Sequence, residues 1–128
     1  MNEIVLDASV ILAILFNEPG PDALPSDFLE RAILSTVNLA EAQTKLLQRG
    51  FKPELAWEGT LALAVNTIEF SAAQARIAGD LILQTQPRGL SLGDRSCLAL
   101  AIERQAPVYT TDQAWHTLDL GIPIHVIR

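Results

Sequence analysis

The sequence is poor in cysteine and has no long apolar run, and both absences limit what the protein can be. Of its 128 residues only Cys97 is a cysteine, which excludes an internal disulfide and a zinc site built from several cysteines. No apolar stretch reaches the roughly 18 residues that a membrane helix needs. The N-terminal residues, Met1-Asn2-Glu3, lack the basic segment of a secretory signal. We therefore expect a cytoplasmic protein with no membrane span.

Basic residues are also scarce. Nine Lys and Arg against 15 Asp and Glu give a formal net charge of −6. This balance argues against nucleic-acid binding through a broad basic face. It permits a group of carboxylates that holds cations, or a basic partner protein, although a charge of this size often serves solubility alone. Hydrophobic residues make up 49% of the chain, enough for a core, and the length fits one domain that spans residues 1–128.

Short β-rich runs alternate with helical patterns along the chain. The expected strands lie at residues 3–6, 32–37, 65–70, 107–112 and 122–127. The expected helices lie at residues 9–16, 26–31, 38–50, 53–63, 71–86 and 93–105. Apolar strands that are separated by helices are typical of a parallel sheet with helices on both faces. The predicted fold class is therefore α/β, and ligands in such folds bind beyond the carboxyl ends of the strands.

Four acidic residues lie at the expected strand ends and helix starts. Asp7 ends the first strand and Asp112 ends the fourth. Glu41 lies in the first turn of the helix after the second strand, and Asp94 in the first turn of the helix before the fourth. Because strand ends and helix starts share one edge of a parallel sheet, all four acids can meet there. Carboxylates that meet raise one another's pKa, so either some are protonated or a cation binds them.

Each acid taken alone has a purely structural explanation. Residues 38–41 and 91–94 both have the form of a capping box, in which the acid only satisfies a backbone N–H of its own helix. Asp7 and Asp112 can likewise be helix caps. Residues 71–74 form a third such box without an acid, which shows how ordinary the pattern is. A functional interpretation therefore requires that the acids meet.

A cluster of carboxylates suits Mg²⁺ or Mn²⁺. These ions prefer oxygen ligands, and Mg²⁺ is bound by a few carboxylates together with substrate phosphate. Such a metal polarises a phosphoryl oxygen, lowers the pKa of water and neutralises charge in the transition state. This is the chemistry of metal-assisted phosphodiester hydrolysis, which requires no separate His or Lys base.

Four segments resemble the motifs of PIN-domain ribonucleases, most closely those of the VapC toxins of bacterial toxin–antitoxin pairs. They are VLDASVILAILFNEPG, LSTVNLAEAQTKLL, SLGDRSCLALA and VYTTDQAW, in the family's order. The resemblance implies a PIN-like three-layer sandwich with a parallel sheet of order 3-2-1-4-5 and helices on both faces. It also implies a Mg²⁺- or Mn²⁺-dependent endoribonuclease that acts on single-stranded or loop RNA and leaves a 5′-phosphate.

The same resemblance implies site residues and partners. The family's acidic pocket, which binds metal directly or through water, corresponds here to Asp7, Glu41, Asp94 and Asp112. Ser9 and Thr111 occupy positions where the family often has a hydroxyl, so we expect both to support the acids. By analogy with VapC proteins, the chain forms a homodimer and pairs with a cognate VapB-like antitoxin that lays a segment across the pocket.

Few basic residues flank the motif segments, which argues against a high affinity for RNA. Exposed cations are usually only solvated, and those near the motif helices in sequence are Lys45, Arg49, Arg88 and Arg95.

The remaining chemically capable side chains are interpreted as structural. His125 alternates with apolar residues in the last strand, and His116 fits an exposed helix position. Cys97 fits a buried apolar site and Trp115 a packed one. Trp57 belongs either to the core or to a surface that binds a partner.

Two other α/β fold classes do not fit these patterns, and one alternative function does. A response-regulator receiver domain needs an aspartate at the end of its third strand, and VNTIEF has none. A dinucleotide-binding module needs a glycine in its phosphate loop, and LDASVILA has none. The remaining alternative is a non-catalytic PIN fold that binds RNA or a partner protein. The full set of four acids argues against it, because a pure binder has little use for clustered negative charge.

Overall fold

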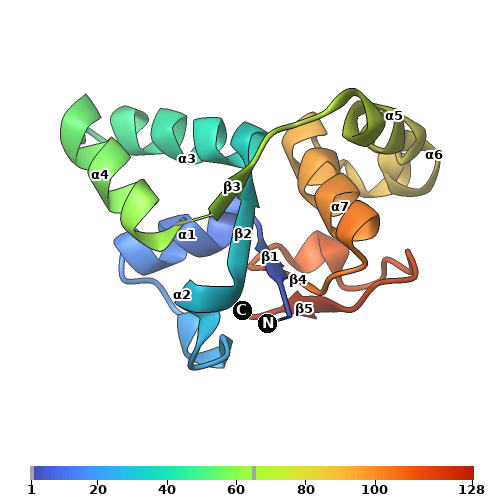
Figure 1. Cartoon of the computed structure of the whole chain (residues 1–128), viewed down its shortest axis with the longest axis horizontal. Coiled ribbons are helices and arrows are strands. Elements are labelled where there is room, and N and C mark those ends of the chain that lie inside the picture. The colour runs from blue at the N-terminus through green and yellow to red at the C-terminus, as the bar shows by residue number, and fades with distance from the viewer. Residues whose placement is uncertain (1, 65) are drawn as a thin grey trace.

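Five short strands form one parallel sheet (Figure 1). The computed structural model describes residues 2–64 and 66–128, so residue 65 of the expected third strand lies outside the described residues. The strands are β1 (Ile4–Leu6), β2 (Ala32–Ser35), β3 (Asn66–Ile68), β4 (Val108–Thr110) and β5 (Ile124–Val126). They lie in the order β3-β2-β1-β4-β5, which confirms the order that the resemblance implied.

Helices lie on both faces of this sheet (Figure 1). The longer ones are α1 (Ala8–Leu15), α3 (Thr36–Gln48), α4 (Pro53–Leu63), α5 (Ala72–Asp80) and α7 (Leu92–Arg104). The short ones are α2 (Phe28–Arg31), α6 (Ile82–Thr85) and the 3-10 turns η1 (Pro21–Ala23), η2 (Gln86–Arg88) and η3 (Gln113–Trp115). Among the described residues, no helix combines the length and the apolar character that a bilayer span requires.

Alternating side chains of the strands build two cores, one on each face. Ile4 and Leu6 of β1 pack with residues of α1 and α3, whereas Val5 packs with residues of α7. Successive residues of a strand point to opposite faces, so apolar residues at three consecutive positions bury both sides of β1. Packing on both faces thereby holds β1 in place, and it also fixes the position of the residue that follows the strand, Asp7.

The second strand is two residues shorter than predicted, and the reason is local. Ser35 Oγ accepts a hydrogen bond from the Val37 backbone N–H at 3.2 Å, so α3 begins at Thr36. Asn38 lies inside the helix and is not its cap. The capping box expected at residues 38–41 is therefore wrong.

Two further helices compare differently with their predictions. The box at residues 91–94 is confirmed, because Ser91 and Asp94 exchange both of its hydrogen bonds. The helix predicted over residues 71–86 is interrupted at Leu81, where α5 ends before α6.

Most of the side chains that the sequence indicated to be structural have the environment expected of them. Cys97 and Trp115 are completely buried, and His116 is exposed at the end of η3. The His125 ring stacks on the Tyr109 ring with 4.5 Å between centroids. Trp57, by contrast, is 43% exposed on α4, so it does not belong to the core.

Candidate metal and catalytic site

Asp7 lies at the carboxyl end of the central strand, where β1 gives way to α1. Its backbone N–H donates to the Tyr109 carbonyl at 3.0 Å, which continues the pairing of β1 with β4. The residue occupies the N-cap position of α1, but its side chain makes no capping hydrogen bond. Its side chain is nevertheless buried, with 4% exposure. Helix capping therefore does not explain this carboxylate.

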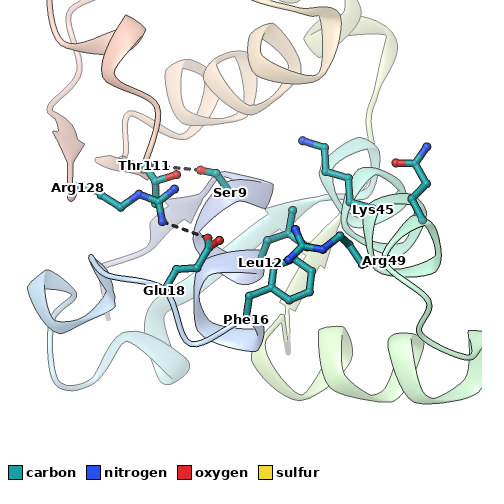
Figure 2. A pocket seen from close by; sticks show the side chains of 9 residues that line it. Ser9, Leu12, Phe16, Glu18, Lys45, Arg49, Thr111 and Arg128 are labelled. Atoms are coloured by element: carbon teal, nitrogen blue, oxygen red, sulfur yellow. Dashed lines mark hydrogen bonds and ion pairs between the residues drawn. The ribbon is translucent and has the colours of Figure 1, made fainter.

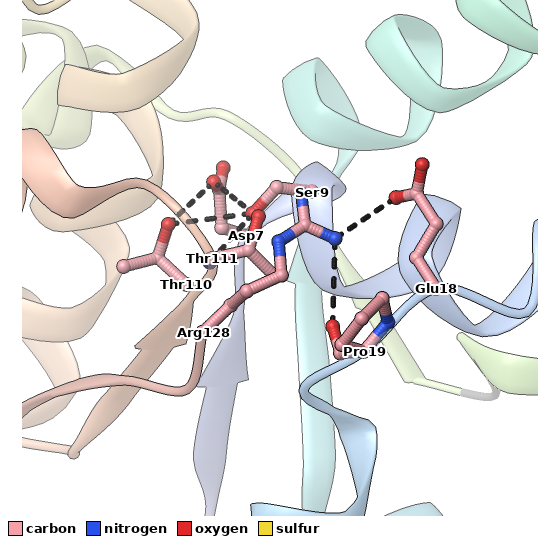
Figure 3. A network of polar contacts seen from close by, with 7 residues as sticks. All are labelled: Asp7, Ser9, Glu18, Pro19, Thr110, Thr111 and Arg128. Carbon is pink, nitrogen blue, oxygen red and sulfur yellow. Dashed lines mark hydrogen bonds and ion pairs between the residues drawn. The ribbon is translucent and has the colours of Figure 1, made fainter.

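Two hydroxyl groups hold the Asp7 carboxylate (Figure 3). Ser9 Oγ donates to Asp7 Oδ2 at 2.8 Å, and Thr110 Oγ1 donates to the same oxygen at 2.9 Å. Each hydroxyl also accepts a backbone N–H, Ser9 from Thr111 at 3.0 Å and Thr110 from Asp112 at 3.1 Å. These bonds tie the start of α1 to the end of β4 and fix the orientation of the carboxylate.

Glu41 is positioned by Asn38, one helical turn earlier on α3. Asn38 Nδ2 donates to Glu41 Oε1 at 2.7 Å and to the Gly93 carbonyl at 3.0 Å, so one buried amide joins α3 to the start of α7. A Cβ atom at Gly93 would overlap the Glu41 carboxylate. Glycine at this position therefore lets the carboxylate rest directly against the α7 backbone.

Asp94 serves its own helix as well as the site. Its Oδ2 accepts the Ser91 backbone N–H at 2.9 Å, and its own N–H donates to Ser91 Oγ at 3.1 Å. The structural explanation of this acid is thus confirmed. It does not exclude a second role, because the charge of Asp94 also acts on its neighbours.

Asp112 follows β4 and caps the short turn η3. Its Oδ1 accepts the Ala114 backbone N–H at 2.9 Å. The link between Asp112 and the other acids runs through its backbone N–H, which donates to the Thr110 hydroxyl. Asp112 is thus connected to the Asp7 network through its backbone.

Three of the acids influence one another electrostatically. The pKa of Asp7 is raised from an ordinary 3.8 to about 6, mainly by burial and also by the negative charges of Asp94 and Glu41, while the hydrogen bonds from the Ser9 and Thr110 hydroxyls oppose the rise. Burial, with the same three acids, also raises the pKa of the Cys97 thiol well above its usual value. Asp7, Glu41 and Asp94 therefore form one group of interacting charges above a buried thiol.

This group has the right chemistry for a hard divalent cation. Its donors are all carboxylate oxygens, which Mg²⁺ and Mn²⁺ prefer, and a cation would offset the repulsion that raises the pKa of Asp7. Within residues 2–64 and 66–128, however, no three acidic, His or Cys side chains are arranged so that they could hold a metal ion. The hydrogen bonds to Asn38 and Ser91 engage Glu41 and Asp94 in this arrangement.

Comparison with known proteins identifies the family. The sequence profile of the PIN domain matches residues 4–120. This chain belongs to the PIN-domain family. The match includes strands β1 to β4 and all four acidic positions, and β5 lies just beyond it.

Solved structures with the same PIN fold include toxin–antitoxin proteins. A chain of the DNA-bound VapBC complex from Salmonella typhimurium matches with a TM-score of 0.73 at 18% identity, over 97% of both chains. VapBC-5 from Mycobacterium tuberculosis matches with a TM-score of 0.63 at 23% identity, over 100% of this chain and 99% of the other. VapC20 from the same organism, described as a sarcin-ricin loop cleaving toxin, matches with a TM-score of 0.66 at 18% identity, over 94% and 99%. At these identities the likeness shows the fold, and none of the curated proteins compared with the chain matches it.

Three residues that position the acids were missed by the sequence analysis. Thr110, and not Thr111, donates its hydroxyl to Asp7, whereas Thr111 contributes its backbone N–H. Asn38 and Gly93 hold Glu41 in place. The spacing of Asn38 three residues before Glu41 was a usable signal, because such residues share one face of a helix.

Proposed function

We propose that the chain is a Mg²⁺- or Mn²⁺-dependent endoribonuclease and the toxin of a VapBC-type pair. The observation that carries this proposal is the buried Asp7 carboxylate, held by two hydroxyls beside Glu41 and Asp94, with its pKa raised to about 6. Membership of the PIN-domain family supports a nuclease function in general. RNA as the substrate also implies the cytoplasm as the place of action.

The proposed roles follow from how each side chain is held. Asp7, Glu41 and Asp94 would bind the cation, and Asp112 would complete the acidic pocket through water. When bound, the cation would activate water for attack on phosphorus and neutralise charge on the phosphate. Ser9 and Thr110 keep the Asp7 carboxylate from rotating, and Asn38 does the same for Glu41. Such prepositioning lowers the reorganisation that the reaction requires.

Cleavage of RNA by the purified protein tests this proposal. We expect a 5′-labelled single-stranded RNA to be cut with Mg²⁺ or Mn²⁺, and the activity to disappear with EDTA and in Asp7→Asn. Asp80→Asn is the matched control, because Asp80 is exposed and pairs only with Arg76 on α5. Circular dichroism should show both variants folded. Undiminished cleavage by Asp7→Asn would contradict the site assignment.

A second candidate function is a non-catalytic PIN domain that binds RNA or a partner protein. Two observations favour it: Asp94 and Asp112 cap their own helices, and the described acids are not arranged to hold a metal. Calorimetry with Mg²⁺ and Mn²⁺ separates the two functions. Heat of binding that is lost in Asp7→Asn supports the nuclease, whereas no binding and no cleavage would favour the binding module.

We also propose a VapB-like antitoxin and a second copy of the chain as partners. The structural neighbours include VapBC complexes, and α4 exposes the large apolar side chains Leu55 and Trp57. Expression of the chain alone should arrest the growth of a bacterial host, and co-expression of the antitoxin should restore it. Light scattering of the purified chain should give twice the mass of 13.9 kDa. A monomer in solution would remove the homodimer from this proposal.

A further inference from the structure

A hollow of about 380 Å³ adjoins the acidic site (Figure 2). We call it the α1–α3 groove, and its lining includes Ser9, Phe16, Lys45, Arg49, Thr111 and Arg128. Ser9 donates to Asp7, and Thr111 donates its N–H to Ser9. The groove therefore begins at the hydrogen bonds that hold the central carboxylate.

Two positive charges in this groove, those of Lys45 and Arg49, form no ion pair with any described residue. Arg128 pairs with Glu18 at 3.1 Å, and the other ion pairs among the described residues use Arg31, Arg76 and Arg104. Lys45 and Arg49 take part in none of them. Lys52, Arg88 and Arg95 are likewise outside these ion pairs, but Lys45 and Arg49 line one groove together, where their charges can act on the same anion.

Helix spacing connects these cations to the site. Glu41 and Lys45 lie four residues apart on α3, about 6 Å along the helix axis, and Arg49 follows four residues after Lys45 as the C-cap residue of the helix. A second hollow is lined by Glu41 and Thr44, and it shares Lys45 and Gln48 with the α1–α3 groove. The surface is therefore continuous from Glu41 to Arg49.

The Arg49 guanidinium lies over an aromatic ring. Its guanidinium carbon lies 4.2 Å from the centroid of the Phe16 ring, a cation–π contact. Phe51 meets the Phe16 ring edge to face at 5.9 Å between centroids. Since the Arg49 side chain remains exposed, its planar group offers a surface on which a base can stack.

We propose that Lys45 and Arg49, with Phe16 beneath Arg49, bind the single-stranded RNA that flanks the scissile bond. Lys45 would contact a flanking phosphate, and Arg49 would contact the next phosphate and stack on its base. The combination of a cation track with a stacking surface is typical of single-strand binding. The inference rests on the proposed function, because the acidic site supplies the reason for RNA to be there.

Binding of RNA without cleavage tests the inference. A fluorescein-labelled 12-nucleotide RNA of mixed sequence is titrated in EDTA at several salt concentrations, with fluorescence anisotropy as the readout. Lys45→Gln should weaken binding and reduce the salt slope by about 0.7, the value for one phosphate contact with a single strand. Lys52→Gln is the matched control, since Lys52 is the chain's only other lysine and lies outside the groove.

Arg49 is tested by two substitutions that separate its charge from its shape. Arg49→Gln should reduce both affinity and salt slope, whereas Arg49→Lys should keep the slope and lose about fivefold in affinity, the lower end of one base stack. Arg76→Gln is the control on α5. In the cleavage assay the groove variants should raise KM and leave kcat unchanged, because uniform binding is lost.

The outcomes distinguish this inference from the proposed function. If the wild type cleaves RNA while groove variants bind RNA like their controls, the inference is wrong and the nuclease stands. If the wild type does not cleave but the groove variants lose RNA binding, the nuclease is wrong and the groove stands. Groove variants that keep RNA binding but lose the co-expressed antitoxin would show that the groove binds protein, and would overturn the inference.

Discussion

The surroundings of Asp7 disfavour the ionised form of its carboxyl group. The carboxyl is buried, the charges of Glu41 and Asp94 lie near it, and two hydroxyls only partly offset these effects. A rise in pKa from 3.8 to about 6 means that the ionised form is less favourable in the folded than in the unfolded chain by about 3 kcal/mol. Without a cation, the ionised Asp7 carboxylate therefore destabilises the folded chain, even though two hydroxyls donate hydrogen bonds to it.

The first prediction concerns pH. Because the folded pKa of Asp7 is the higher one, the folded state holds the proton longer, and stability is lost as pH rises from about 4 through about 6. In EDTA, the free energy of unfolding of Asp7→Asn relative to wild type should rise by about 2 kcal/mol between pH 4 and pH 7. Urea titrations across this range measure it, and a difference that does not depend on pH would contradict the raised pKa.

The second prediction separates two neighbouring threonines. Thr110→Val removes the hydroxyl that donates to Asp7 and leaves the Asp112 N–H without its acceptor, so we expect a loss of about 1–3 kcal/mol in stability. Thr111→Val keeps the backbone N–H that donates to Ser9 and should change stability by less than about 0.5 kcal/mol. Thermal unfolding of both variants checks this, and equal effects would show that the hydroxyl of Thr110 is unimportant.

The choice between Thr110 and Thr111 could not be made from the sequence. It depends on the register of β1 and β4, in which Leu6 lies opposite Tyr109, so that Asp7 is level with Thr110. A shift of one residue would have placed Thr111 there, because successive side chains point to opposite faces. Apolar patterns identify strands, but they do not fix the register between strands that are 100 residues apart.

At the scale of elements, the N-terminal parts of α3 and α7 determine where the carboxylates of Glu41 and Asp94 lie. The order of the strands followed from the resemblance. The sequence correctly placed Asp7 and Asp112 after β1 and β4 and Asp94 in the first turn of α7, but Glu41 lies in the second turn of α3 and not in the first. The sequence misplaced the start of α3, since Ser35 and Asn38 are both good N-caps and only the strand pairing up to Ser35 decides between them. The assignment of the acids as metal ligands remains a prediction.

The third prediction concerns the contact between α3 and α7. Gly93→Ala should displace the Glu41 carboxylate, so we expect metal binding and RNA cleavage to fall about as far as in Glu41→Gln. The matched control is Gly79→Ala in α5, where an added Cβ meets no atom within 4 Å. The control should gain up to about 1 kcal/mol from helix propensity and keep full activity.

The double variant Gly93→Ala with Glu41→Gln completes this test. If Gly93 acts through Glu41, the second substitution should add little to the loss of metal binding caused by the first. Additive losses in calorimetry would show that Gly93 acts independently of Glu41.

At the scale of the whole molecule, the net charge of the chain and the charge of the acidic site are both negative, so both favour the binding of a cation. The chain carries a formal charge of −6, and three of its acids gather at one edge of the sheet. A cation that binds only the folded state stabilises it by mass action. The fold and the proposed cofactor should therefore be thermodynamically linked.

The fourth prediction is that Mg²⁺ stabilises the wild type. At a concentration of about 100 times its dissociation constant, the gain in the free energy of unfolding should be about 2.7 kcal/mol. Asp7→Asn should show a much smaller gain, whereas Asp80→Asn should behave like the wild type. Thermal unfolding with and without Mg²⁺ measures the effect, and equal gains in all three proteins would place the cation elsewhere.

The central position of β1 has a consequence for how the protein is made. Asp7 leaves the ribosome before its site can form, because one of its two supporting hydroxyls belongs to Thr110, 103 positions later. Glu41 and Asp94 emerge between them, and β1 gains its neighbour β4 only after both. A nascent chain that has not yet reached Thr110 thus has acids without a site, so the ribosome that makes the protein is not exposed to the proposed activity before β4 has emerged.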